Sequence, residues 1–157
     1  MQKLLQLLSD AEEKTRINKQ RLIIIALAIL GALSVFMPWR TYFGERQTGF
    51  ALGFFTVLVF FSFVVFIILC LIGDRTNTII GKSKIVMYIL GGYSIFIPFI
   101  LIIDIATYTS EYGIEANDLF SSHFGAYLAL FMGLTILAVL IISNILAKKQ
   151  IITKENE

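Results

Sequence analysis

The stretch FALGFFTVLVFFSFVVFIILCLI, residues 50–72, decides the fold, because it runs for 23 residues without a charged side chain. An α-helix of about 20 apolar residues spans a hydrocarbon core roughly 30 Å thick. Three more uncharged runs lie at about 22–38, 85–103 and 124–146. The sequence therefore predicts an all-α integral membrane protein built as a bundle of four transmembrane helices.

The positive charges lie almost entirely on one side of these runs. Of the 13 Lys and Arg residues, only Arg40 and Arg46 fall in the segments 39–49 and 104–123. Loops rich in Lys and Arg stay on the cytoplasmic side of a membrane. We therefore expect a multi-pass protein of the cell (inner) membrane, with the N-terminus, the C-terminus and the segment 73–84 in the cytoplasm.

The predicted membrane domain comprises residues 22–146, and short extensions precede and follow it. At 157 residues and 57% hydrophobic composition, the chain has no room for a soluble domain. Residues 1–21 predict an amphipathic helix that either lies in the membrane interface or extends the first span into the cytoplasm. Residues 147–157 predict a cytoplasmic tail. The net charge is only +2 and topology accounts for the cations, so we expect membrane lipid and no nucleic acid as a partner.

Small residues mark two faces where helices can approach closely. Gly49 and Gly53 form a GxxxG pair at the start of the second run, and Gly125, Ala129 and Gly133 recur every four residues in the fourth. Such patterns let membrane helices pack backbone against backbone. We expect these faces to bury against neighbouring helices, within one chain or between the subunits of an oligomer.

The interior of the predicted spans has few polar groups. It lacks Asp, Glu, Lys, Arg and His, which usually mark ion or proton paths, and this argues against a proton-coupled transporter. Pro98 removes one helical hydrogen bond and predicts a bend in the third span, either a static kink or a gating hinge. The hydroxyl groups, which we expect to bond to their own helix backbone, are those of Ser34, Thr56, Ser62, Ser94 and Thr135.

Charged and aromatic residues gather at the predicted outer rim. Trp39 and Tyr42 follow the first span, where aromatic side chains anchor helices at the membrane interface. Arg40 ends that span and Asp104 ends the third, so we expect an ion pair between them if the two helices are adjacent. His123 has carboxylates nearby in the sequence, but a single His at this spacing matches no zinc motif. We therefore expect a solvated acidic loop and no metal.

The chain carries no catalytic motif. It has no HExxH, no GxSxG and no glycine-rich phosphate loop, and its single cysteine, Cys70, has no partner for an intramolecular disulfide. We expect neither enzymatic activity nor a cofactor.

Four segments carry a likeness to known proteins: MPWR at 37–40, GFALG at 49–53, GDR at 73–75 and GAYLA at 125–129. With four spans and cytoplasmic termini, the chain resembles small uncharacterised four-span (tetraspan) proteins of bacterial inner membranes over most of its length. The neighbourhood of Trp39 is also similar to that of claudins. However, the outer segment 39–49 has no cysteine pair and is too short for the claudin β-sheet, so the likeness implies no claudin function.

These observations predict a non-enzymatic membrane subunit. It would oligomerise, or anchor or sense for a partner at the cytoplasmic face, as membrane components of bacterial defence or secretion assemblies do. An oligomeric ion channel or pore is the alternative, because an acidic outer rim suits cation entry, although no polar stripe runs along any span. A small-solute or lipid transporter without ionisable coupling groups is a second alternative.

Overall fold

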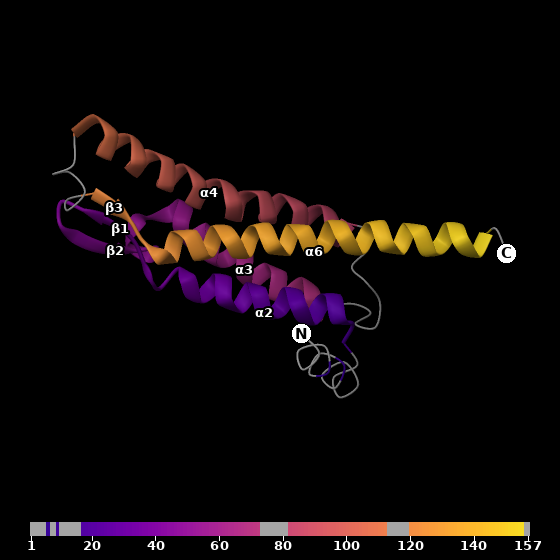
Figure 1. Ribbon diagram of the computed structural model, residues 1–157. Coiled ribbons are helices and arrows are strands. Elements are labelled where there is room, and N and C mark those ends of the chain that lie inside the picture. The colour runs from indigo at the N-terminus through magenta and orange to yellow at the C-terminus, as the bar shows by residue number, and fades with distance from the viewer. Residues whose placement is uncertain (1–5, 7–8, 10–16, 73–81, 113–119, 156–157) are drawn as a thin grey trace.

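Four helices pack side by side in the computed structural model, which describes residues 6, 9, 17–72, 82–112 and 120–155 (Figure 1). They are α2 (Lys19–Ser34), α3 (Phe54–Leu71), α4 (Lys82–Tyr112) and α6 (Phe124–Glu155). Helix α2 packs against α3 and α6, and α4 packs against the same two helices. The helices therefore form a closed ring in which α2 and α4 lie on a diagonal. The predicted helix within residues 1–21 falls almost entirely outside the described residues.

A three-stranded antiparallel sheet covers one end of this bundle (Figure 1). Its strands are β1 (Pro38–Tyr42), β2 (Glu45–Thr48) and β3 (Phe120–Ser122), in the order β2-β1-β3. Phe43 and Gly44 join β1 to β2 with φ angles of 48° and 79°, which suits a two-residue hairpin turn. The sequence indicates only a short outer segment at 39–49. The structure instead forms a hairpin there and adds the strand that precedes α6.

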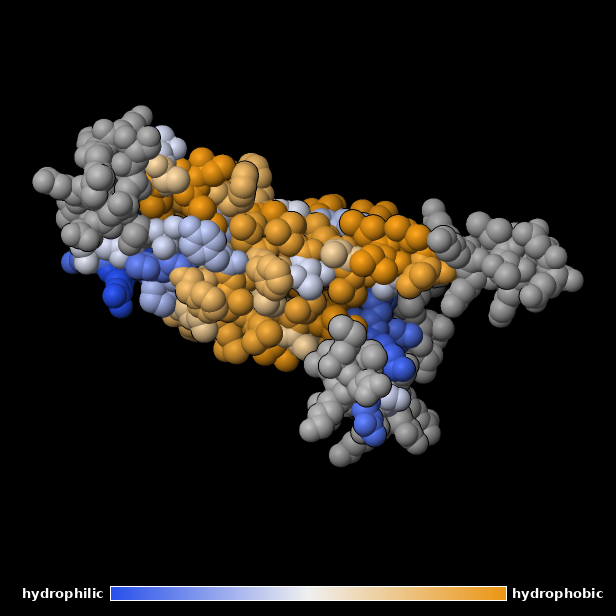
Figure 2. Space-filling view, viewed as in Figure 1, coloured by the Kyte–Doolittle hydropathy of each residue, from blue (hydrophilic) through white to orange (hydrophobic). Residues whose placement is uncertain are grey.

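Three helical segments in the described part of the chain are long and apolar enough to cross a bilayer: Phe54–Leu71, Ser83–Thr107 and Phe124–Leu146. They fit a multi-pass membrane protein. Helix α2 has 16 residues, which corresponds to about 24 Å, and it ends before the turn that leads to Pro38. Large apolar side chains cover the middle of the bundle, and hydrophilic residues lie toward its ends on the face shown in Figure 2.

The helix boundaries differ from the predicted ones at several places. Helix α2 runs over Lys19–Ser34 rather than 22–38, because a turn and the strand β1 follow Ser34. Helix α3 begins at Phe54 rather than at residue 50, because Gly53 has φ 102° and interrupts the helical backbone. Helix α4 continues to Tyr112 rather than ending at 103, and α6 continues to Glu155, so most of the predicted tail is helical. Polar residues extend these helices because nothing in their local sequence breaks them.

Four of the five predicted hydroxyl groups bond to the backbone of their own helix, as predicted. Ser62 Oγ donates to the Leu58 carbonyl at 2.9 Å, and Ser94 Oγ donates to the Leu90 carbonyl at 2.7 Å. The same pattern holds for Ser34 and Thr135, whereas Thr56 donates to the carbonyls of Gly49 and Gly53, which precede α3. Since these donors are used within the chain, they do not form a polar path across the bundle.

A buried arginine joins the ends of α2 and α3 away from the sheet. Arg21 is 6% exposed, and its Nη1 donates to the carbonyl oxygens of Cys70 at 2.9 Å and Ile72 at 3.1 Å, with Leu69 at 3.5 Å. The last carbonyls of a helix have no partner within the helix. The guanidinium group therefore caps α3 and holds it against α2.

Candidate functional site

The indole of Trp39 fills the end of the bundle beneath the sheet. It is 1% exposed, and its Nε1–H donates to the Ser34 carbonyl at 2.8 Å. Gly125 of α6 lies so close that a Cβ there would come within 2.6 Å of the Trp39 ring and 2.7 Å of the Pro38 carbonyl. The predicted position of Trp39 in an aromatic belt differs from this one, because the ring packs inside the protein. The β1 strand thus turns its tryptophan into the helices.

Hydrogen bonds tie β3 and the start of α6 to β1. The backbone N–H of His123 donates to the Trp39 carbonyl at 2.9 Å, and the His123 ring shares a hydrogen bond of 2.5 Å with the Thr41 hydroxyl. Ser122 Oγ and the Tyr127 hydroxyl lie 2.6 Å apart. These bonds give His123 a structural role in the sheet. It also lines a surface hollow of about 230 Å³ together with Met37, Pro38, Arg46 and Phe124.

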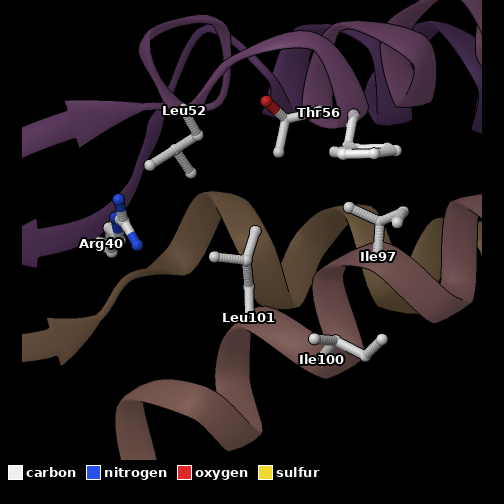
Figure 3. Close-up of a pocket in the computed structure, with 7 residues that line it drawn as sticks. Arg40, Leu52, Thr56, Ile97, Ile100 and Leu101 are labelled. Atoms are coloured by element: carbon white, nitrogen blue, oxygen red, sulfur yellow. The ribbon is translucent and has the colours of Figure 1, made fainter.

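A second hollow of about 200 Å³ lies between α3 and α4, next to the sheet (Figure 3). We call it the α3–α4 crevice. Arg40 lies at the end near the strands, and its Nε donates to Gln47 Oε1 at 3.0 Å. The other residues that line the crevice are Leu52, Phe55, Thr56, Ile97, Ile100 and Leu101. It is therefore an apolar space with one cationic side chain at one end.

The described residues offer no group of three or more His, Cys, Asp or Glu side chains that could hold a metal ion. Of the carboxylates near His123 in the sequence, Glu115 and Asp118 lie outside the described residues. Asp104 is exposed on α4, and an ion pair between it and Arg40 stays a prediction.

The predicted small-residue stripe on α6 is buried within the chain. Gly125, Ala129 and Gly133 are all buried, and a Cβ on Gly133 would come within 3.1 Å of Ile95 and 3.4 Å of the Ser94 carbonyl on α4. Pro98, which is buried inside α4, has no N–H to donate to that same carbonyl. The stripe thus provides close packing between helices of one chain. Whether Pro98 is a hinge stays a prediction.

The GxxxG pair does not form a helical face. Gly49 and Gly53 flank a short 3-10 helix, Phe50–Leu52, before α3. Gly49 packs against Val35 and Trp39, where a Cβ would come within 2.8 Å of Val35 atoms. Gly53 has open space around it and φ 102°, so its glycine serves the backbone turn rather than packing. Outside this glycine pair, Tyr42 is the last residue of β1. Its register partners are Glu45 on β2 and Phe120 on β3.

Two polar contacts of the structure are not predicted by the sequence. By its place in the sequence Arg21 is one of the cations that orient the chain, whereas in the structure it also caps α3. Asn144 Nδ2 donates to the Tyr88 hydroxyl at 2.9 Å and so joins α6 to α4. A signal for the first was available, because Arg21 directly precedes an apolar run and can reach a neighbouring helix end with its long side chain.

Comparisons with known proteins identify no relative: no protein-family model matches the chain, no curated protein matches its sequence, and no solved structure matches its fold. The candidate function therefore depends on the chain's own geometry.

Proposed function

We propose that the chain is a four-span inner-membrane protein, in which α2 is the fourth span and the sheet lies on the outer face. Helix α2 is short, but it packs along α3 and α6, from the Arg21 cap at one end to Trp39 at the other. Its start, the start of α4 and the end of α6 lie away from the sheet (Figure 1). Lys19, Lys82, Lys84, Lys148, Lys149 and Lys154 are in these segments. The positive-inside rule then supports a cytoplasmic position for that end of the bundle.

Cysteine labelling tests this topology. In a Cys70→Ser background, Arg46→Cys at the sheet should react with a membrane-impermeant maleimide in intact spheroplasts, because Arg46 is exposed there. Lys154→Cys near the end of α6 should react only after the membrane is permeabilised. The opposite pattern, or labelling of both sites from outside, would contradict the proposed orientation.

We further propose that the protein is a non-enzymatic subunit that presents α6 to a partner at the cytoplasmic face, the partner being a second copy or another protein. One observation supports this most directly. The apolar segment of α6 ends at Leu146, but the helix continues without interruption to Glu155 and extends past the ends of the other helices (Figure 1). A continuous helix places its projecting residues at a defined distance and direction from the membrane, which suits the docking of a partner.

The packed interior argues against the alternative of a pore through a single chain. Ile24, Phe63, Phe66, Met87 and Ile136 are fully buried between the helices. Ions would have to cross this apolar layer without polar ligands, at a high desolvation cost. A pore between subunits of an oligomer would need a different lining, and no observation on the described residues favours one.

Native mass spectrometry of the protein in mild detergent tests the subunit proposal. The full-length chain should give a homo-oligomer or a complex with another protein, whereas a chain that ends at Leu146 should give mainly the free monomer. Retention in the carbonate-washed membrane fraction checks that the short chain is still inserted. A second truncation, which removes only residues 1–16, keeps Ile17 and Arg21 in their buried positions and serves as the matched control.

Two outcomes would count against the subunit proposal. One is a monomeric full-length protein under all mild extraction conditions. The other is a complex of the same subunit composition for the chain that ends at Leu146, which would place the partner contact elsewhere.

A further inference from the structure

The α3–α4 crevice reaches the lateral surface of the bundle. Phe55 and Ile100 are 66% and 45% exposed, and both line it from opposite helices. This surface lies within segments that are apolar enough to cross a bilayer. An apolar chain can therefore enter from the hydrocarbon without passing through water. Deeper in the crevice, Ile97 and Leu101 are partly buried against the core of the bundle.

The lining offers little to a polar solute. Thr56 is the only uncharged polar side chain among the seven residues that line the crevice, and its hydroxyl donates to the Gly53 carbonyl at 2.9 Å and to the Gly49 carbonyl. In Figure 3 its oxygen points away from Ile97 and Leu101. A volume of about 200 Å³ is also small beside the roughly 300–1,000 Å³ of sites for drug-sized ligands. A space of this size, open along the lateral surface, holds part of one hydrocarbon chain.

The positive charge of Arg40 at the end of the crevice favours a ligand whose polar group is an anion. Arg40 is part of β1 and lies at the end of the crevice nearest the sheet, and this is the depth of lipid headgroups if the sheet faces the outer solvent (Figure 3). A guanidinium group is always protonated, and its planar array of N–H donors matches the oxygens of a phosphate. Its hydrogen bond to Gln47 holds the side chain in place across the β1–β2 hairpin.

We propose that the α3–α4 crevice binds one acyl chain of an anionic phospholipid from the surrounding leaflet, with the lipid phosphate at Arg40. The proposal goes beyond the subunit function, since it needs α3 and α4 to lie in a bilayer but no protein partner. A bound lipid would fill the side of the ring where α3 faces α4. Tyr93 on α4, whose hydroxyl donates to the Phe55 carbonyl at 2.9 Å, already joins the two helices there.

The experiment measures lipid retention by native mass spectrometry. The purified full-length protein is delipidated and incubated in mixed micelles with phosphatidylglycerol or with phosphatidylcholine of the same acyl chains. Arg40→Gln removes the charge, and Arg46→Gln removes the same charge from β2, outside the crevice. Ile97→Trp fills the crevice, and Ile89→Trp adds the same bulk to a site on α4 that is 67% exposed. Thermal unfolding in the same micelles checks that each variant is folded.

We expect wild type to retain one phosphatidylglycerol in preference to phosphatidylcholine. Arg40→Gln should lower that preference about tenfold, which corresponds to the loss of one charge-assisted contact. Ile97→Trp should lower the retention of both lipids, while Arg46→Gln and Ile89→Trp behave as wild type. Equal effects of Arg40→Gln and Arg46→Gln would show that the lipid preference depends on general surface charge and not on the crevice. That outcome would overturn the proposal. Full retention of lipid by Ile97→Trp would overturn the proposal as well. This second test does not depend on whether Arg40→Gln folds.

Discussion

Replacement of Arg21 by methionine is expected to lower the free energy of unfolding by about 3 kcal/mol, because it removes hydrogen bonds from a charged donor to buried acceptors. Methionine keeps the apolar stem of arginine but ends at the position of Nε, so it brings no donor to these acceptors. It leaves the carbonyl groups of Cys70 and Ile72, which Arg21 approaches to 2.9 Å and 3.1 Å, without their donor at the end of α3. Reversible unfolding in mixed micelles with increasing SDS measures the difference.

Two further variants show how much of the loss of stability in Arg21→Met is due to the hydrogen bonds of the cap. Arg21→Lys keeps the charge and a donor nitrogen, but an ammonium group is more strongly hydrated than a guanidinium group and costs more to bury, so an intermediate loss is expected. Lys19→Met removes a cation from an exposed site in the same turn of α2 and should change the stability little. A loss after Arg21→Met no larger than that after Lys19→Met would show that the cap contributes little to the fold.

The Arg21 cap is a contact that composition along the chain does not predict. Hydropathy and the distribution of cations identify apolar helices and assign their ends to two sides, because both depend on composition along the chain. The partner of Arg21 lies 49 residues away, at the end of another helix. Only the lateral order of the helices, in which α2 is adjacent to α3, brings the two together, and single-sequence hydropathy holds no information on that order.

The small residues illustrate the same limit in another form. The spacing of Gly125, Ala129 and Gly133 predicts a packing face, and the three residues are buried. The helical period does not say which residues of the chain pack against them. The pair Gly49 and Gly53 has the same spacing, yet Gly53 interrupts the backbone at φ 102°. A GxxxG pattern describes a face only where the intervening residues are α-helical, and the sequence did not reveal that α3 begins after it.

The candidate crevice was beyond prediction for a related reason. In the sequence Arg40 is a cation at the rim, whereas Leu52, Ile97 and Leu101 are ordinary apolar residues of two separate runs. The hairpin of β1 and β2 then brings Arg40 and Gln47 together at the edge of this space. A short strand pair of polar and aromatic residues next to a long apolar run has too weak a period to be recognised in the sequence.

Replacement of Gly125 by alanine is expected to destabilise the protein by about 3 kcal/mol, at the upper end of the cost of overpacking. The added methyl group would lie 2.7 Å from the Pro38 carbonyl oxygen and 2.9 Å from that of Ser34, and backbone atoms cannot move aside as a flexible side chain can. The third atom in its way belongs to the indole of Trp39, at 2.6 Å. Trp39 is the only tryptophan in the chain, so its fluorescence reports this site alone. We expect a shift of its emission to longer wavelength as the ring leaves its buried position.

Gly92→Ala on α4 is the matched control, since it adds the same methyl group where nothing lies within 4 Å. Alanine favours a helix over glycine by about 1 kcal/mol, so this variant should be as stable as wild type or slightly more stable. The difference between the two variants then isolates the contact at the end of the bundle from helix propensity. If Gly125→Ala keeps both the wild-type stability and the wild-type emission, α6 does not approach β1 as closely as described. The Trp39 ring would then pack less closely against α6. The position of β1, which carries Arg40 at the end of the α3–α4 crevice, would also be less fixed.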